Sequence, residues 1–344
     1  MSANKIGVLL INLGTPDSPS TKDVRSYLTE FLNDPRVIDI NAVGRTVLVN
    51  GAIVPFRAPK SAKIYGDLWR LWNGNSPLLT FGESLKEKVQ KIVDADTKNI
   101  TIEFAMRYKN PSLKTVLSKM EKAGYDQLIL LPLFPQYASS STGSALEKAM
   151  QIIGKWWTIP SIKTIASFYN HPGFIKSFIA QAKKHNLADF DHVLFSYHGL
   201  PERQINKVHP AFTCNNCNCD KEHKPEQSLC YKNACYQTTR LIADGLNLTE
   251  KEYTVAFQSR LGKTPWLTPY SDKIVEELAK AGKKNILVFS AAFIADCLET
   301  SVEIGMEYSE IFKNNGGTKL QLVESLNDSE TWVQTVKNLI LEQL

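Results

Sequence analysis

The sequence predicts an α/β protein with two similar doubly wound, Rossmann-like halves, each a parallel sheet flanked by helices. Three observations lead to this prediction. Short apolar runs rich in β-branched residues alternate with longer stretches of helical spacing, a pattern typical of parallel sheets covered on both faces. The chain has 344 residues, well above the ~150 of an average domain. Two short motifs also recur in the second half of the chain.

The expected elements follow one another in the order that this fold requires. Helical stretches are recognised by apolar residues that recur every three or four positions. They are expected at 84–93, 112–123, 144–153, 172–185, 234–245 and 271–281. The strands are expected at 6–12, 100–106, 127–132, 162–167, 193–197, 253–257, 285–289 and 320–323.

The recurring motifs each end a predicted strand. The strand before Gly14 is similar to the strand before Gly199, and Phe-Ala-Met-Arg107 is similar to Phe-Gln-Ser-Arg260. Two such halves form a cleft at the carboxyl ends of their strands, the usual ligand site of open α/β sheets. The expected division is an N-terminal half (1–170) with a flap-like insertion (45–70), and a C-terminal half (171–344) with an insertion (206–235), whose last helix packs back on the first half.

Composition excludes several classes of protein. With 43% hydrophobic and 22% charged residues, the chain is neither disordered, nor a disulfide scaffold, nor a fibrous repeat. Its apolar runs are shorter than the ~20 residues of a membrane span, and a strand-like run begins too early for a signal peptide. We therefore expect a cytoplasmic protein. The net charge of +5 comes without a basic stripe, which argues against nucleic-acid binding.

Segment 45–70 interrupts the α/β pattern with the apolar runs Val47-Leu-Val and Gly51-Ala-Ile-Val-Pro-Phe56, followed by Arg57 and two lysines. One interpretation is a surface helix with an apolar face. The other is a flap over an apolar ligand, or a shallow contact with a membrane surface.

Five of the six cysteines lie close together in the second insertion. A reduced cytosolic protein rarely gathers thiols for disulfides, so this cluster predicts a metal site. Its members are Cys214, Cys217, Cys219, Cys230 and Cys235.

Two motifs of the second half carry acid–base chemistry. His198 ends a predicted strand and precedes Gly199, which places an imidazole at the edge of the sheet, where it can accept a proton or bind a metal. Glu299, Glu303 and Glu307 recur every four residues and share one face of a helix. This face is either a solvated acidic stripe or a carboxylate track for cations and protons.

Three further loops have the side chains to bind a flat, aromatic anion. The loop from Leu131 to Ser144 is rich in hydroxyls and contains Gln136, but lacks the lysine of a nucleotide-binding P-loop. Trp72-Asn-Gly-Asn-Ser76 and the loop from Phe257 to Tyr270, which contains Trp266, place aromatic rings beside polar groups.

Taken together, these motifs are similar to those of a known enzyme family. The whole chain resembles the ferrochelatases, enzymes that insert Fe²⁺ into a porphyrin at the end of haem biosynthesis, with the matching segments in family order from residue 6 to residue 307. The matching segments are LINLGTP (10–16), YLTEFLNDPRVI (27–38), AMRY (105–108), LPLFPQY (131–137), SYHGLP (196–201), FQSR through Trp266 (257–266) and DCLET (296–300).

The resemblance implies roles for the residues singled out above. His198 and Glu299 are the central pair that handles iron and the pyrrole protons, and Glu303 and Glu307 extend an acidic path from Glu299. The implied porphyrin contacts, in a cleft between the two halves, are Arg107, Ser76, Gln136 and Trp266. Relatives often carry His at the position of Cys297 and Met at that of Leu13.

The implied substrates are protoporphyrin IX and Fe²⁺, with two protons released and no electron transfer. Coproporphyrin ferrochelatases and chelatases for other tetrapyrroles are the alternatives among enzymes, and a non-catalytic haem or iron–sulfur binding protein is the alternative of another class. A peripheral membrane contact is expected because the substrate is apolar. The sequence leaves a monomer and a homodimer open.

The resemblance extends to the cysteine segment, because certain bacterial ferrochelatases hold a [2Fe–2S] cluster in an internal segment of this kind. Four of the five thiolates would bind the cluster: Cys230 and Cys235, with two of Cys214, Cys217 and Cys219. A structural Zn²⁺ site is the alternative.

Overall fold

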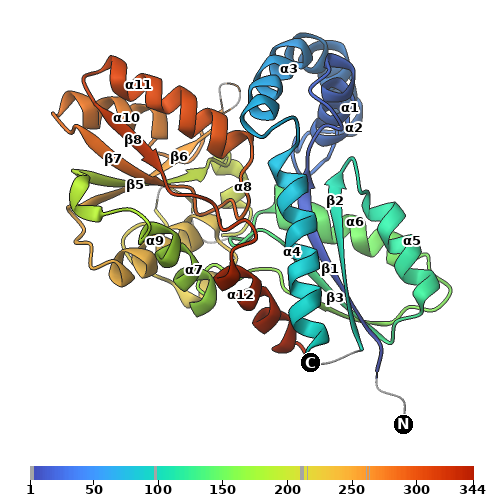
Figure 1. Cartoon of the computed structure of the whole chain (residues 1–344). Helices are drawn as coiled ribbons and strands as arrows, with labels where there is room; N and C mark the ends of the chain where they lie inside the picture. Colours follow the sequence, from blue (N-terminus) through green and yellow to red (C-terminus); the bar gives the residue numbers. More distant parts are fainter. Residues whose placement is uncertain (1–3, 97–98, 210–212, 215, 261, 263) are drawn as a thin grey trace. The chain divides into compact units, whose positions relative to one another are not determined.

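The computed structural model describes residues 4–96, 99–209, 213–214, 216–260, 262 and 264–344. The chain forms two compact units (Figure 1). The first contains residues 1–134, 139–166 and 333–344, and the second contains residues 135–138 and 167–332.

The first unit is a four-stranded parallel sheet in the order β2-β1-β3-β4. Its strands are β1 (Ile6–Gly14), β2 (Ile100–Tyr108), β3 (Gln127–Pro132) and β4 (Ser161–Thr164). The central strand β1 is apolar on both faces, and Val8 through Ile11 are fully buried. Helices cover both faces, as a buried parallel sheet requires.

The helices of the first unit fall into two groups. On one face α5 (Leu113–Ala123) and α6 (Ser144–Ile153) pack against side chains such as Leu9, Leu128 and Leu130, while α4 (Pro77–Asp94) contacts β1 and β2 (Figure 1). The second group is α1 (Thr21–Leu32), α2 (Ala42–Val47), the π-helix η1 (Leu48–Ile53) and α3 (Val54–Leu71), which share a smaller core. Another π-helix, η2 (Ser139–Gly143), leads into α6.

The second unit repeats the same topology, with strand order β6-β5-β7-β8. Its strands are β5 (His192–His198), β6 (Tyr253–Gln258), β7 (Asn285–Phe289) and β8 (Lys319–Leu322). The prediction of two similar parallel-sheet halves is confirmed. In the neighbouring strands β5 and β7, Phe195 and Phe289 stack with ring centroids 4.7 Å apart, which ties the two strands together beneath the helices.

Helices also cover both faces of the second sheet. One face carries α10 (Ser271–Lys280), α11 (Ser309–Asn314) and the long π-helix η5 (Leu298–Tyr308), which pack on Leu194, Ile286 and Val288. Helices α7 (Pro172–Ala182) and α9 (Tyr231–Gly245) pack against each other. The shorter helices are η3 (Leu187–Asp189), α8 (Glu202–Asn206) and η4 (Pro225–Gln227).

The last helix, α12 (Glu330–Leu341), begins in the second unit, but residues Val333–Leu344 belong to the first. Lys337 forms an ion pair with Asp96, and Lys163 donates a hydrogen bond to the carbonyl of Gln343. Through these contacts the last twelve residues pack on the first unit. Among the described helices, none is both long and apolar enough to cross a membrane.

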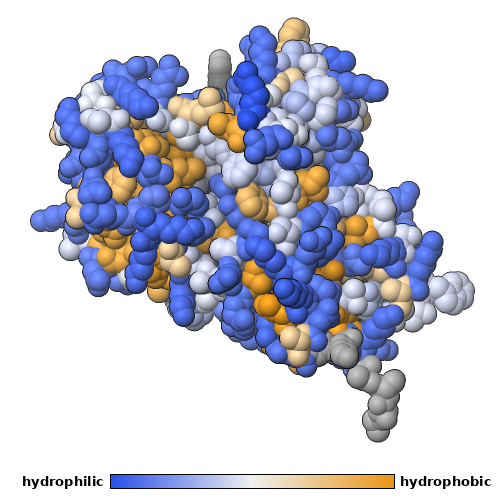
Figure 2. All heavy atoms as spheres, in the orientation of Figure 1, coloured by the Kyte–Doolittle hydropathy of each residue, from blue (hydrophilic) through white to orange (hydrophobic). Residues whose placement is uncertain are grey.

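The segment predicted as an interruption is helical throughout, from α2 through η1 to α3. The helices α2, η1 and α3 expose several large apolar side chains in addition to their cations, with exposed fractions of 75% for Val43, 68% for Val47 and 76% for Phe56. Elsewhere on the face seen in Figure 2, apolar residues occur in small groups among hydrophilic ones.

Candidate functional site

The candidate residues of the second unit gather at the carboxyl edge of its sheet. His198 is the last residue of β5 and lies opposite Gln258, the last residue of β6. The π-helix η5 follows β7 through a short loop. Because parallel strands end at one edge, these elements converge there, as expected for a ligand site in this fold.

The His198 imidazole is held in one orientation and one tautomer. Its Nδ1 lies 2.6 Å from the carbonyl oxygen of Gly199. A carbonyl only accepts hydrogen bonds, so Nδ1 carries the proton and Nε2 of the neutral ring presents a lone pair. The Tyr231 hydroxyl donates to the His198 carbonyl at 2.9 Å, and the Phe293 ring lies 6.3 Å from the imidazole. The geometry suits a proton acceptor or a metal ligand.

Gly199 is required where it stands because the chain passes close to β6. Its N–H donates to the Gln258 carbonyl at 2.7 Å. A Cβ at this position would lie 2.9 Å from the same oxygen, closer than side chains tolerate, and 3.4 Å from the ring of Trp266. Trp266 itself is half-buried, next to the loop that orients His198.

Gln258 links the residues that the sequence analysis treated separately. Its side chain is 2% exposed, and its Oε1 accepts from the Ser196 hydroxyl at 2.8 Å. Its Nε2 donates to the Glu299 carbonyl and to Oε2 of Glu303, both at 3.1 Å. Gln258 belongs to the Gln-Ser-Arg motif, but nothing in the sequence predicted a role for this glutamine. Only the fold brings β6 and η5 together.

Glu303 is the most restrained of the three glutamates. Besides Gln258, it accepts hydrogen bonds from the Ser259 N–H at 3.1 Å, the Ser259 hydroxyl at 2.6 Å and the Tyr308 hydroxyl at 2.9 Å. Ser259 has a φ of +57°, a left-handed conformation that costs a non-glycine residue ~1–2 kcal/mol and aims its N–H at the carboxylate. Two protein donors reach each carboxylate oxygen, so Glu303 is fixed in place.

Glu299 and Glu307 lie on either side of Glu303 along η5. Glu299 is half-buried in the first turn of the helix, and its carboxylate accepts a hydrogen bond from the buried thiol of Cys297. Glu307 lies in the last turn, where partial burial and the charge of Glu303 raise the pKa of its carboxyl. The spacing of four residues between the glutamates predicts that they share one face of an α-helix. The structure instead has a π-helix here, with i→i+5 hydrogen bonds, a rare conformation that is found at functional sites.

The start of η5 is anchored by Asp296. Its carboxylate accepts from the Asn327 amide at 2.7 Å and from the hydroxyls of Ser325 (3.0 Å) and Thr300 (3.2 Å). The Thr300 hydroxyl in turn accepts from the Cys297 N–H at 2.9 Å. Asp296 and Thr300 of the DCLET motif therefore hold the helix in position, and Cys297 is buried beside them.

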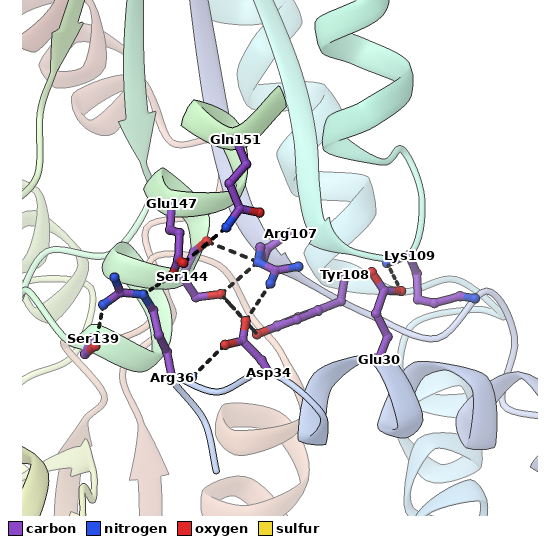
Figure 3. Close-up of polar contacts among 10 residues, drawn as sticks. All are labelled: Glu30, Asp34, Arg36, Arg107, Tyr108, Lys109, Ser139, Ser144, Glu147 and Gln151. Carbon is purple, nitrogen blue, oxygen red and sulfur yellow. Dashed lines mark hydrogen bonds and ion pairs between the residues drawn. The ribbon is translucent and has the colours of Figure 1, made fainter. Parts of the chain in front are cut away.

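Arg107 lies at the carboxyl edge of the first sheet, in the network of Figure 3. Its guanidinium donates to Asp34 at 2.5 Å and to the Ser144 hydroxyl at 2.7 Å. Asp34 also accepts from Tyr108 at 2.9 Å and from the Arg36 N–H at 2.7 Å. Despite burial, these donors hold the pKa of the Asp34 carboxyl below its usual value. Arg107 therefore has internal partners, and contact with a ligand stays a prediction.

The other two predicted ligand contacts also have partners within their own units. The Ser76 hydroxyl donates to that of Thr15 at 3.1 Å. Gln136 is 2% exposed, and its Nε2 donates to the Thr238 hydroxyl at 3.1 Å and to the Ala291 carbonyl at 3.3 Å. Gln136 thereby joins the loop after β3 to α9 and to the loop after β7.

The cysteine segment is compact and its thiols are buried. Sγ of Cys230 lies 4.0 Å from Sγ of Cys219, and the Cys217 thiol donates to the Cys214 carbonyl at 3.3 Å. Burial raises the pKa of the Cys214 thiol to about 11. Cys235 is separate: it is fully buried on α9 beside Tyr231 and Tyr197.

Sequence analysis missed His209 in this segment. A ring nitrogen of His209 and the sulfurs of Cys219 and Cys230 all lie within 4.8 Å of one another. A lone histidine in a polar insertion carries no signal of its own. Residues 210–212 and 215, between His209 and Cys217, lie outside the described residues.

Comparison with known proteins shows which family the sequence matches. A family model described as "Ferrochelatase" matches residues 5–344. The chain is 44% identical over 340 residues to the ferrochelatase of Legionella pneumophila (strain Corby), which covers 98% of this chain and 99% of that one. It is 42% identical over 344 residues to the ferrochelatase of Coxiella burnetii (strain Dugway 5J108-111), with 99% and 94% covered.

Solved structures share the fold. SirB from Bacillus subtilis with Fe³⁺ superposes with a TM-score of 0.55 at 11% identity, covering 98% of this chain and 95% of that one. The sirohydrochlorin chelatase SirB from B. subtilis subspecies spizizenii in complex with cobalt gives a TM-score of 0.52 at 11% identity, with 98% and 93% covered.

Proposed function

This chain belongs to the ferrochelatase family and is therefore an enzyme that inserts ferrous iron into a porphyrin, the last step of haem synthesis, and we propose which porphyrin it takes and which side chains act. The reaction requires that two pyrrole N–H protons leave as Fe²⁺ enters the ring. It therefore needs a proton acceptor, a weak site for the cation and a route for protons to water.

We propose that His198 accepts a pyrrole proton through Nε2. The support is the short hydrogen bond from Nδ1 to the Gly199 carbonyl, which leaves Nε2 as the basic atom of the neutral ring. The same carbonyl stabilises the imidazolium that forms, because Nδ1–H remains its donor after Nε2 is protonated. The proton can then pass to a carboxylate or to water.

We propose that Glu299 completes the central pair and that Glu303 and Glu307 continue the path. Carboxylate oxygens are suitable ligands for a hard cation, and a site for Fe²⁺ as substrate must release it again. The Glu299 carboxylate has the Cys297 thiol, a weak donor, as its partner, whereas four donors restrain Glu303. This difference assigns transfer to Glu299 and positioning to Glu303. The raised pKa of Glu307 suits a group that exchanges protons with solvent.

Among the predicted porphyrin contacts, we propose Trp266 as the one that meets the ring directly, because it flanks the Gly199 loop. We propose that Ser76, Arg107 and Gln136 shape the site through the hydrogen bonds described above. The porphyrin is proposed to be protoporphyrin IX, with coproporphyrin as the alternative. Comparing kcat/KM for the two porphyrins tests this choice: a higher value for protoporphyrin IX is expected, and poor turnover of both would refute it.

The test of the central assignment is His198→Ala, assayed anaerobically by the loss of porphyrin fluorescence as iron enters. General base catalysis contributes ~10²–10⁴-fold, so kcat is expected to fall by that factor while the thermal unfolding temperature stays the same. The matched control is His185→Ala, which removes an imidazole that pairs with Glu324 at 3.1 Å on the surface. Near-normal iron insertion by His198→Ala would contradict the assignment.

We propose a peripheral membrane contact through α2, η1 and α3. Its support is the exposure of Val43, Val47 and Phe56 together with Arg57 and nearby lysines, a combination typical of interfacial helices. Sedimentation with vesicles that contain anionic lipid is expected to carry the protein down. Val47→Ser/Phe56→Ser should weaken this binding, and equal binding by the double variant would refute the proposal.

We propose that the cysteine segment holds a metal centre, a [2Fe–2S] cluster, with Zn²⁺ as the alternative. The donors present fit either group: several buried thiols in a short segment, two of them with sulfurs 4.0 Å apart, suit thiolate-bound iron–sulfur and zinc centres. Cys214, Cys217, Cys219 and Cys230 are available as ligands, whereas Cys235 packs against tyrosines. Either group would cross-link the segment when bound, and the iron–sulfur cluster alone would also supply a redox-active centre. Visible absorption of anaerobically purified protein is expected, and a colourless zinc protein would identify the alternative.

A further inference from the structure

The imidazole of His209 has no explained role in the fold. It is 5% exposed, and its Nε2 is buried with no hydrogen-bond partner among the described residues. A buried nitrogen without a hydrogen-bond partner is unfavourable, so this atom is expected to bind a ligand.

The neighbours of this imidazole are metal ligands by type. Its ring nitrogen and the sulfurs of Cys219 and Cys230 lie within 4.8 Å of one another, and the two sulfurs are 4.0 Å apart. Three atoms spaced ~4 Å apart surround a point ~2.3 Å from each, which is the zinc–sulfur bond length and close to the zinc–nitrogen one. A single metal atom therefore fits between these three side chains with small adjustments.

We propose that His209 is a ligand of the metal centre in this segment, beside Cys219 and Cys230, so that the centre has mixed nitrogen and sulfur coordination. The proposal rests on the metal centre proposed above but does not depend on which metal fills it. In an iron–sulfur centre, a histidine in place of a cysteine raises the reduction potential. In a zinc site, three thiolates and one imidazole form an ordinary structural set.

His223 provides the matched control. It belongs to the same segment, but its Nε2 lies 3.1 Å from the Tyr169 hydroxyl, which gives it a partner. Glutamine is used at both positions because it retains a polar side chain of similar length but binds these metals poorly. Loss of even an outer partner of a metal ligand costs ~10–100-fold in affinity. His209→Gln is therefore expected to lose metal to a competing chelator at least tenfold more readily than the wild type, and His223→Gln is not.

X-ray absorption spectroscopy of the purified full chain, measured at the absorption edge of the metal that it contains, identifies the ligand atoms directly. The wild type is expected to show nitrogen at ~2.0 Å in addition to sulfur at ~2.3 Å, and His209→Cys, which offers a thiolate instead, to show sulfur alone. An all-sulfur shell in the wild type, or nitrogen that persists in His209→Cys, would overturn the role of His209 but leave the metal centre intact. A purified protein without metal would overturn the metal centre itself, and with it this inference.

Discussion

The Asp34 carboxylate accepts four hydrogen bonds and forms a buried ion pair with Arg107. Replacing Asp34 with asparagine is therefore expected to destabilise the first unit. The side chains of Asp34 and Arg107 are 3% and 13% exposed. Asp34→Asn preserves the shape but removes the charge, and it leaves the guanidinium of Arg107 facing neutral groups at the end of β2 (Figure 3). The donors from Tyr108, Ser144 and Arg36 also lose their charged acceptor.

The expected cost follows from the burial of the pair. Removing one partner of a buried ion pair costs ~3–5 kcal/mol, and each kcal/mol lowers the unfolding temperature of a domain of this size by ~2–4 °C. The first unit of Asp34→Asn should therefore unfold ~6–20 °C below the wild type. The effect depends on pH: because the pKa of Asp34 is lowered in the folded state, its contribution is present above the usual value of 3.8 and is lost as the pH falls through the folded pKa.

Differential scanning calorimetry at pH 7 and at pH values well below 3.8, with hydrogen exchange of β1 and β2 to assign the transition, measures this effect. The matched control is Asp272→Asn, which breaks the pair with Arg260 at 2.8 Å, whose side chains are 27% and 41% exposed. An exposed pair contributes ~0–1 kcal/mol, so the shift should stay below ~4 °C. Equal shifts for the two variants would show that the Asp34 network is no more than a surface pair.

Three further predictions concern the second unit. Gln258→Leu removes the bonds that join β6 to η5 and should lower kcat ~10²-fold with little change in the KM for porphyrin; an unchanged kcat would remove Gln258 from the positioning of Glu303. Gly199→Ala places a Cβ 2.9 Å from the Gln258 carbonyl and should lower both kcat and the unfolding temperature, whereas a wild-type unfolding temperature would show that the loop can shift. Burial lowers the pKa of His192, so the unfolded state takes up its proton first and stability should fall as the pH drops below ~6.5. His192→Gln should flatten that part of a thermal-unfolding pH profile, and an unchanged profile would assign the dependence to other groups.

Much of the fold could be predicted from the sequence because its signals are local. The predicted strands at 127–132 and 285–289 coincide with β3 and β7, and the predicted helix at 144–153 coincides with α6. Buried parallel strands are short apolar runs bounded by polar residues, and this pattern needs no knowledge of the partner strand. The extra residues of β2, up to Tyr108, depend on Gly14 and the paired edge of β1, which is tertiary information.

The positions of two candidate site residues could be predicted from the sequence because each lies at the end or the start of an element. His198 ends β5 and Glu299 lies in the first turn of η5, positions that the sequence marks with Gly199 and with the DCLET motif. The hydrogen bonds that fix Glu303 were not predictable, since Gln258 and Ser259 donate to it from 45 and 44 positions away. Nor was the π-helical form of η5, because its glutamate spacing of four also fits an α-helix.

The cysteine segment shows the limit of reasoning from residue type. Five closely spaced thiols predicted a metal site with Cys230 and Cys235 among its ligands, whereas in the structure Cys235 lies on a helix and packs against tyrosines. Cys235 lies on the buried face of α9, where Tyr231 precedes it by one helical turn and Tyr197 packs from β5. His209 was missed for the opposite reason, because its relation to Cys219 and Cys230 exists only after the loops have folded.

The assignment of residues 333–344 to the first unit has a consequence for synthesis on the ribosome. The first unit lacks its final piece until roughly 170 further residues have been translated after Ala166, which takes ~10–30 s at ~5–20 residues per second. The second unit is continuous apart from residues 135–138 and is translated in full during this interval. The unit that contains the N-terminal strand is therefore completed last, and until then the surface that later binds α12 is open to chaperones and to other nascent chains.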